Sequence, residues 1–127
     1  MKLIKQSSRA SPKISLVLID WSVRESFHLL HYLEKQTLYR ERFEIIIVEY
    51  YSYISDAIKQ FETEVDTWIL LEMPTECYYH KHLMYNVGIF FSQGDIVVIC
   101  DSDVMVKPSF LESIFVEFKK IPILFCT

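Results

Sequence analysis

The sequence predicts an α/β domain in which helices cover both faces of a mostly parallel sheet. Three largely apolar runs of strand length, at 14–19, 43–48 and 96–100, are rich in β-branched residues, and the last of them is unbroken. Such runs are typical of strands that are buried on both faces between helical layers. Stretches with apolar residues at helical spacing separate the runs, so strands and helices alternate along the chain. The length of 127 residues fits one domain with a substantial core.

Short sequence motifs predict where the individual strands and helices begin and end. Residues 1–12 carry no strand or helix pattern and are predicted to be a flexible lead-in. Ser22 with Glu25 forms a capping box at the first helix, and Gly94 stands where a C-terminal glycine would end the third. We expect strands at 14–19, 43–48, 67–71, 96–100 and 123–126, and helices at 22–35, 55–65, 83–93 and 109–118. The last two helices are expected to bring aromatic residues into the core, namely Phe90, Phe91, Phe110, Phe115 and Phe118.

Two aspartates one residue apart, Asp101 and Asp103, follow the run at 96–100. Ligands of open α/β sheets sit beyond the carboxyl ends of the strands, so acids at this edge need an explanation. On an extended backbone both carboxylates would point to the same side and repel each other. Oxygen-only ligands favour Mg²⁺ or Mn²⁺, which typically takes substrate phosphates as further ligands. The alternative is a polar turn in which either aspartate caps local amides.

Composition narrows the classes of partner. The formal net charge of −4 argues against nucleic acid, which would require a basic face. Lys2, Lys5, Arg9 and Lys13 make the start of the chain basic, as suits either a solvated tail or peripheral contact with anionic lipid. No apolar run is long enough to span a bilayer, and no signal peptide is evident. The three scattered cysteines indicate buried thiols in a reducing compartment.

Two further clusters have a functional and a structural interpretation. Cys77, His80 and His82 suggest zinc, but no second ligand pair exists at a recognised spacing, so a polar helix start is the alternative. The tyrosines at 50, 51 and 53 suit either stacking on a nucleotide base or loop packing against the edge of the sheet.

A series of short motifs follows the predicted elements in order. They are Asp20-Trp21-Ser22-Val23-Arg24, Leu33-Glu34-Lys35-Gln36-Thr37, Glu44-Ile45-Ile46-Ile47-Val48-Glu49, Asn86-Val87-Gly88-Ile89 with Gly94-Asp95, and Asp101-Ser102-Asp103 with Pro108-Ser109-Phe110-Leu111. In this order and spacing, the series resembles the nucleotide-binding half of a family 2 glycosyltransferase over roughly residues 14–115. The resemblance implies a Rossmann-like GT-A sandwich, with 13–127 as a nucleotide-sugar-binding domain that lacks the acceptor half.

The resemblance also implies roles for single residues. Asp20, Trp21 and Arg24 would line the base and phosphate end of a pocket for a UDP- or GDP-sugar. Glu49 would read the base. Asp101 would approach the ribose or the metal, and Asp103 would link the metal to the diphosphate.

The implied activity is metal-assisted, inverting transfer of a sugar from a nucleotide-diphospho-sugar to an unknown acceptor. It would take place in the cytoplasm or at the cytoplasmic face of a membrane, with the catalytic base expected beyond Thr127. Glu49-Tyr50-Tyr51-Ser52 departs from the usual Asp-Asp/Asn-Gly-Ser of the family. One alternative is a catalytically inactive nucleotide-binding or scaffold domain of the same fold. Another is a nucleotidyltransferase, although its glycine-rich phosphate loop is absent after the first strand.

Overall fold

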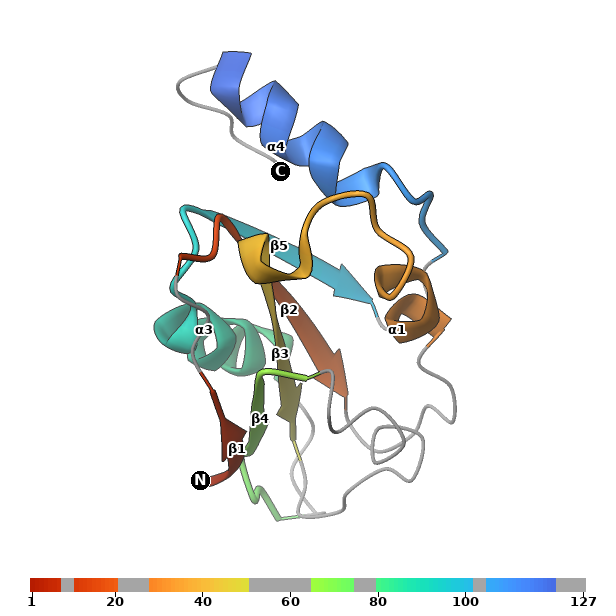
Figure 1. Cartoon of the computed structure of the whole chain (residues 1–127). Helices are drawn as coiled ribbons and strands as arrows, with labels where there is room; N and C mark the ends of the chain where they lie inside the picture. The colour runs from red at the N-terminus through yellow and green to blue at the C-terminus, as the bar shows by residue number, and fades with distance from the viewer. Residues whose placement is uncertain (8–10, 21–27, 51–64, 75–79, 102–104, 121–127) are drawn as a thin grey trace.

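The computed structural model describes residues 1–7, 11–20, 28–50, 65–74, 80–101 and 105–120 (Figure 1). Among them, the side chains of Asp20, His28, Asp101, Lys119 and Lys120 lie outside the description. The described elements, in chain order, are β1 (Lys2–Gln6), β2 (Ile14–Asp20), α1 (His28–Leu33), the 3-10 helix η1 (Arg40–Arg42), β3 (Phe43–Glu49), β4 (Thr67–Leu70), α3 (Lys81–Phe91), β5 (Ile96–Asp101) and α4 (Phe110–Lys120). The predicted strand at 123–126, the helix at 55–65 and the Ser22–Glu25 capping box lie outside these residues.

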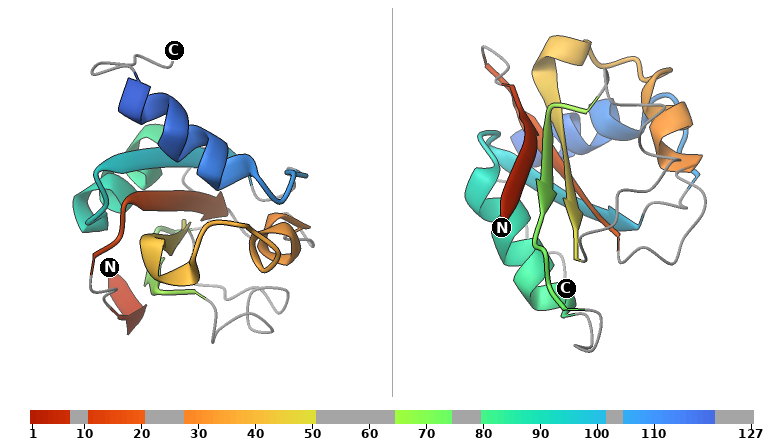
Figure 2. Two further views of the ribbon diagram at one scale, coloured as in Figure 1. Left: turned by 45° about the horizontal axis from the view of Figure 1, so that its top comes forward. Right: turned by 90° about the horizontal axis from the view of Figure 1, so that it is seen from below.

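One sheet forms the centre of the described structure, with the strand order β1-β4-β3-β2-β5. β2 is parallel to both β3 and β5, and β3 is parallel to β4. Helix α3 covers one face of the sheet, whereas α1 and α4 lie on the other (Figures 1 and 2). The predicted α/β class, a mostly parallel sheet between helical layers, is confirmed.

The first residues of the chain differ from the flexible lead-in that the sequence suggested. Lys2–Gln6 form β1, which pairs antiparallel with β4 from Lys2↔Leu70 to Gln6↔Thr67. Ser7 extends the attachment, because its amide and hydroxyl groups donate hydrogen bonds to the Asp66 carbonyl at 2.8 and 3.0 Å. β1 is an edge strand with no fully buried side chain, so backbone pairing rather than an apolar run holds it in place. The prediction was therefore wrong for this segment.

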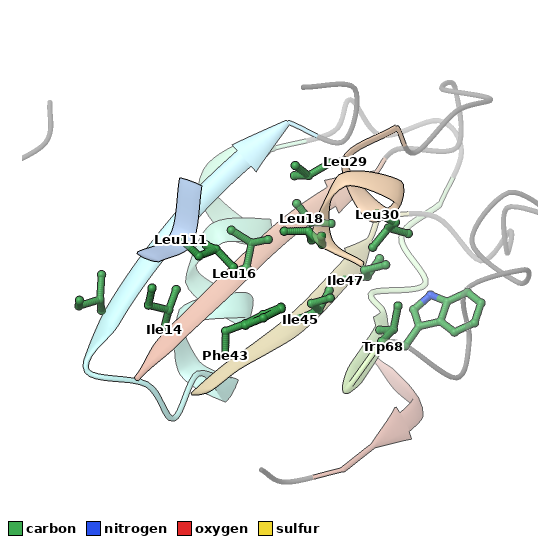
Figure 3. Packing of buried hydrophobic residues seen from close by; sticks show 13 residues of the cluster. Ile14, Leu16, Leu18, Leu29, Leu30, Phe43, Ile45, Ile47, Trp68 and Leu111 are labelled. Atoms are coloured by element: carbon green, nitrogen blue, oxygen red, sulfur yellow. The ribbon is translucent and has the colours of Figure 1, made fainter. Parts of the chain in front are cut away.

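Alternating side chains of β2 and β3 build two separate apolar cores. On one face they pack against Leu29, Leu30 and Leu33 of α1 and Leu111 of α4. Figure 3 shows this cluster, with the residues of β2 and β3 in rows along the strands and Leu29 and Leu30 of α1 at one end of the rows. On the other face they pack against Met84 of α3. Every residue of β3 is buried, which matches the prediction of a strand covered on both sides.

Helix α3 approaches the sheet through a glycine. A Cβ atom at Gly88 would lie 2.4 Å from Cγ1 of Val17, so only glycine allows this separation between α3 and β2. Met84 and Gly88 are the buried residues of the helix, whereas Phe90 is 82% exposed. The prediction that Phe90 belongs to the core was wrong, because the contact at Gly88 turns a different face of the helix to the sheet. No helix in the described ranges is long and apolar enough to cross a membrane.

The turn between α3 and β5 also differs from its prediction. The helix ends at Phe91, Ser92 is an extended C-cap, and no glycine has a positive φ. Gly94 instead lies against the backbone of β2, where a Cβ atom would be 2.8 Å from both the Ile14 carbonyl carbon and the Ser15 nitrogen. Gly94 therefore permits close packing of the turn rather than ending the helix.

Strand β5 is less buried than its apolar sequence predicted. Val97 is 38% exposed and Ile99 is 42% exposed. The reason is its position, since β5 ends the described sheet and α3 packs over β2 and β3 instead. An apolar groove of about 770 Å³ separates β5 from α4 and is lined by residues that include Val98 and Ile114. The expectation of burial on both faces was thus wrong for this strand.

Candidate functional site

The strand order creates a switch point at the carboxyl edge of the sheet. From β2 the chain adds β3 and then β4 on one side, and later adds β5 on the other side of β2. The order in which strands are added to the described sheet therefore reverses at β2. In open α/β sheets, ligands bind in the crevice outside the carboxyl ends of the strands at such a point.

The register brings three predicted site residues to this edge. Asp20 of β2 is the Cα partner of Glu49 of β3. Asp101 of β5 is the Cα partner of Ile19, one residue before Asp20. Three neighbouring parallel strands thus end in acids at the same level. Of the other predicted site residues, Trp21, Arg24 and Asp103 lie outside the described residues.

Glu49 forms part of the wall of this edge. It follows Phe43, Ile45 and Ile47 in alternation, which places its side chain on the face covered by α1, and it is 0% exposed. Its backbone carbonyl accepts a hydrogen bond from the amide of Leu71 at 2.8 Å. A buried carboxylate at the carboxyl end of a central strand is held in one place, as a group that reads a ligand must be.

Tyr50, next in sequence, belongs to the core rather than to an open loop. Its side chain is 0% exposed and packs in the cluster under α3. Its carbonyl accepts a hydrogen bond from the amide of Met73 at 3.0 Å. For Tyr50, packing against the sheet is therefore the correct one of the two interpretations. Tyr51 and Tyr53 lie outside the described residues.

The segment after the acidic pair is held by a residue that sequence reasoning did not select for the site. The Nε2 atom of Gln36 donates hydrogen bonds to the carbonyls of Lys107, at 2.9 Å, and Tyr32, at 3.0 Å. Its Oε1 atom accepts a hydrogen bond from the amide of Leu111 at 3.0 Å. Gln36 belongs to the motif Leu33-Glu34-Lys35-Gln36-Thr37. The residues around it show no pattern that predicts contact with residues so distant in sequence.

The donor set of the site fits a hard divalent cation better than zinc. The acids that end β2, β3 and β5 offer carboxylate oxygens, the ligand type that Mg²⁺ and Mn²⁺ prefer. Within the part of the chain that the structure describes, no three His, Cys, Asp or Glu side chains are grouped to hold a metal. His80 and His82 are exposed at the start of α3, as the interpretation of a polar helix start requires, and Cys77 lies outside the described residues.

No protein-family model and no curated protein sequence matches the chain. Solved structures do resemble it. The crystal structure of Staphylococcus aureus TarS superimposes with a TM-score of 0.72 at 19% identity, over 85% of this chain and 20% of that one. TarS 1–349 gives a TM-score of 0.70 at 18% identity, over 85% and 32%. TarS 1–349 in complex with UDP-GlcNAc gives 0.68 at 17% identity, over 85% and 31%.

These similarities concern the fold. At identities of 17–19% they show that the described sheet and its helices are arranged as in part of TarS. The chain spans between 20% and 32% of the length of the solved TarS chains. The chain therefore has a Rossmann-like α/β fold that it shares with one region of those larger proteins.

Proposed function

We propose that this chain forms the donor-binding part of a nucleotide-sugar-dependent glycosyltransferase of GT-A fold, similar to family 2. The observation that carries the proposal is the convergence of Asp20, Glu49 and Asp101 at the switch point of the sheet. The structural similarity to TarS, which has been solved with UDP-GlcNAc and with UDP, supports a nucleotide-sugar as the ligand.

Each acid has a distinct role in the proposed site. Glu49, held rigidly in β3, accepts hydrogen bonds from the nucleotide base. Asp20 with Trp21 and Arg24 lines the base and phosphate end of the pocket. Asp101 and Asp103 hold Mg²⁺ or Mn²⁺ beside the diphosphate. When bound there, the cation supplies positive charge against the negative charge that develops on the leaving group.

The reaction is a transfer in which the donor's bond between sugar and diphosphate breaks and a bond to an acceptor oxygen forms. We propose an inverting course, with the acceptor hydroxyl deprotonated by a carboxylate that is separate from the donor-binding acids. The site would operate in the cytoplasm or at the cytoplasmic face of a membrane, where the basic residues at 1–13 would contact anionic lipid.

Thermal unfolding with UDP, GDP and Mn²⁺ tests the proposal. A diphosphate present at about 100 times its Kd, together with Mn²⁺, should add about 2.7 kcal/mol to the free energy of unfolding. The gain should require the metal and should be lost in Asp103→Asn. The matched control is Asp95→Asn, because Asp95 is an exposed aspartate at the opposite end of β5, within 3.9 Å of Lys13.

The outcomes separate the alternatives. If no nucleotide diphosphate stabilises the wild-type chain, the proposed donor site is wrong and a scaffold domain of the same fold is the better assignment. If a nucleoside triphosphate stabilises it and diphosphates do not, the nucleotidyltransferase is favoured. If Asp103→Asn and Asp95→Asn lose the metal-dependent gain equally, the assignment of the cation to Asp103 is wrong.

A further inference from the structure

An apolar groove follows β5 on the side of the strand that faces α4, and it continues to the amino end of the sheet. Helix α4 runs along β5 in the opposite direction, so its last turns lie near the start of the strand (Figures 1 and 2). Ile96 and Phe118 line both the groove of about 770 Å³ and a second pocket of about 450 Å³. The two hollows therefore adjoin, and each has the size of a small-molecule site.

The walls of the groove are apolar on both sides. The strand presents Val97 and Ile99, which are substantially exposed. The helix presents Phe110, Ile114 and Phe118, which also pack against the core cluster beneath α1. The polar residues of the described lining are exposed, namely Lys107, Ser109, Ser113 and Glu117. Walls of this kind gain from contact with a hydrocarbon and offer few buried partners to a polar ligand.

The second pocket adds positive charge at one end of the groove. Its lining includes Lys13, just before β2, and Arg42, just before β3, and the Lys13 amide donates a hydrogen bond to the Arg42 carbonyl at 2.6 Å. Within the part of the chain that the structure describes, the Arg42 guanidinium has no hydrogen-bond or ion-pair partner. The Lys13 ammonium reaches only Asp95, at 3.9 Å, and that side chain is 79% exposed. The guanidinium is therefore available to a ligand, and its fork of donors suits carboxylate and phosphate groups.

We propose that the groove and the pocket together bind a single-chain amphiphilic anion. Its hydrocarbon chain lies between β5 and α4, and its carboxylate or phosphate group meets Arg42 and Lys13 at the amino end of the sheet. Charge selects this orientation, because the described lining of the pocket has two cations against one carboxylate, whereas that of the groove has one of each, Lys107 and Glu117. The head group lies at the end of the strands opposite to the proposed donor site, so the inference does not depend on the proposed function.

Isothermal titration calorimetry of the full chain with alkyl phosphates, below their critical micelle concentrations, tests the inference. Octyl, decyl and dodecyl phosphate share one head group and differ in the length of the hydrocarbon. The affinity should rise about fourfold for each added methylene until the groove is filled, because each buried methylene contributes a similar increment. Dodecanoate shows whether a carboxylate or a phosphate is the preferred head group. Dodecanol has no charge and should bind at least about fivefold more weakly than the tighter of the two anions.

Two substitutions that each remove one positive charge locate the head group. Arg42→Gln should weaken binding of the tighter anion about fivefold, as expected for the loss of an exposed ion pair, and should leave the affinity for dodecanol unchanged. Lys107→Gln is the matched control, because Lys107 is an exposed cation of the same groove beside the start of α4. It should change the affinity by less than about twofold, since salt screens charges at that separation.

A second pair of substitutions tests the position of the hydrocarbon chain. Ser113→Trp places a large side chain in the groove without removing a core residue, and should weaken binding of dodecyl phosphate about tenfold or more, because it displaces several methylenes. Val116→Trp, at an exposed position of the same helix outside the described lining, should have no effect. Circular dichroism shows whether both variants fold. If Ser113→Trp does not fold, the chain-length series and the two charge substitutions still decide the inference.

Other occupants of the groove give different results, and each would overturn the inference. An affinity that does not depend on chain length, or a larger loss in Lys107→Gln than in Arg42→Gln, contradicts the proposed pose. Binding to vesicles of phosphatidylserine and phosphatidylcholine without binding to monomeric amphiphiles would assign these residues to a membrane surface. Absence of amphiphile binding by a chain that sediments as a dimer, with the dimer lost in Ser113→Trp, would assign the groove to a second copy. Binding that begins only when residues 121–127 are deleted would assign the groove to that segment.

Discussion

Carboxylates occur at both ends of the parallel strands, but their surroundings differ. At the amino end, Glu44 is 1% exposed and accepts hydrogen bonds from the Ser15 hydroxyl at 2.6 Å and the Gln93 amide at 2.7 Å. Asp66, 3% exposed, accepts bonds from the Arg40 guanidinium at 2.7 Å and the Ile45 amide at 2.8 Å. These acids tie neighbouring chain segments together, so they serve the fold.

At the carboxyl end, the acids come from strand ends instead. Asp20, Glu49 and Asp101 converge from three strands on both sides of the switch point. From this comparison we propose that an acid's position along a parallel strand, more than its burial, decides whether the acid serves the fold or a ligand. Glu44 and Glu49 are both buried and lie in the same strand, but of the two only Glu49 lies at the edge where open α/β sheets bind their ligands. Four substitutions compare the two ends of the sheet, and two of them, at Glu44 and Asp103, test this distinction directly.

The largest effect is expected at the amino end, for Gly94→Ala. The added Cβ would lie 2.8 Å from two backbone atoms of β2, which cannot move without disturbing the centre of the sheet. We expect a loss of about 3 kcal/mol in the free energy of unfolding, measured by urea denaturation. Gln93→Ala, one residue earlier, is the control and should be nearly neutral. A loss below about 1 kcal/mol would mean that the turn is not held as tightly as described.

Glu44→Ala should have the next largest effect. It removes the acceptor for the Ser15 hydroxyl and the Gln93 amide and leaves buried donors without a partner, which should cost about 2 kcal/mol by urea denaturation. Glu34→Ala, at an exposed glutamate after α1, should change stability by less than about 0.5 kcal/mol. If the two variants are equally stable, the amino-end carboxylate does not serve the fold and the comparison fails.

A smaller effect of opposite sign is expected at Glu72, which follows β4. Its φ of 58° lies in the left-handed region that disfavours residues with a Cβ atom. Its neighbours Leu71 and Met73 are held by hydrogen bonds to Glu49 and Tyr50, so the chain cannot relax there. Glu72→Gly should raise the melting temperature, by an amount equivalent to about 0.5–1 kcal/mol. Glu72→Ala removes the same side chain without relieving φ, and a gain of equal size in it would contradict the explanation.

The smallest effect on stability is expected for Asp103→Asn. We expect the free energy of unfolding without ligand to change by less than about 0.5 kcal/mol, because this acid is assigned to ligand binding and not to the fold. The same variant should lose stabilisation by UDP with Mn²⁺ in thermal unfolding. A loss of stability comparable to that of Glu44→Ala, in the absence of ligand, would remove the distinction between the two ends of the sheet.

Sequence periodicity predicted the elements better than their surroundings. The runs at 14–19 and 43–48 became β2 and β3 because their burial on both faces leaves a clear apolar pattern. The run at 96–100 has the same pattern, yet Val97 and Ile99 are substantially exposed, since strand order rather than composition decides which strand ends the described sheet. β1 was missed for the opposite reason, because an edge strand held by backbone pairing needs no apolar run.

The candidate site could likewise be predicted only in part from the sequence. The ends of the strands follow from the apolar runs, which drew attention to Asp101, and the family resemblance singled out Asp20 and Glu49. Their alignment at one edge depends on register, which only the structure provides. The hydrogen bonds of Gln36 could not be predicted from local patterns, because its partners Lys107 and Leu111 lie far along the chain.

The pairing of β2 has a consequence for how the protein is made. β2 is synthesised long before its partner on one side, β5, although Ile14 lies beside Ile96 in the folded sheet. A nascent chain on the ribosome must therefore hold an apolar strand without one neighbour until β5 has been made, and contacts so distant in sequence slow folding. Stalled nascent chains that end before residue 96 should be digested by protease within β2, whereas chains that include β5 and α4 should resist.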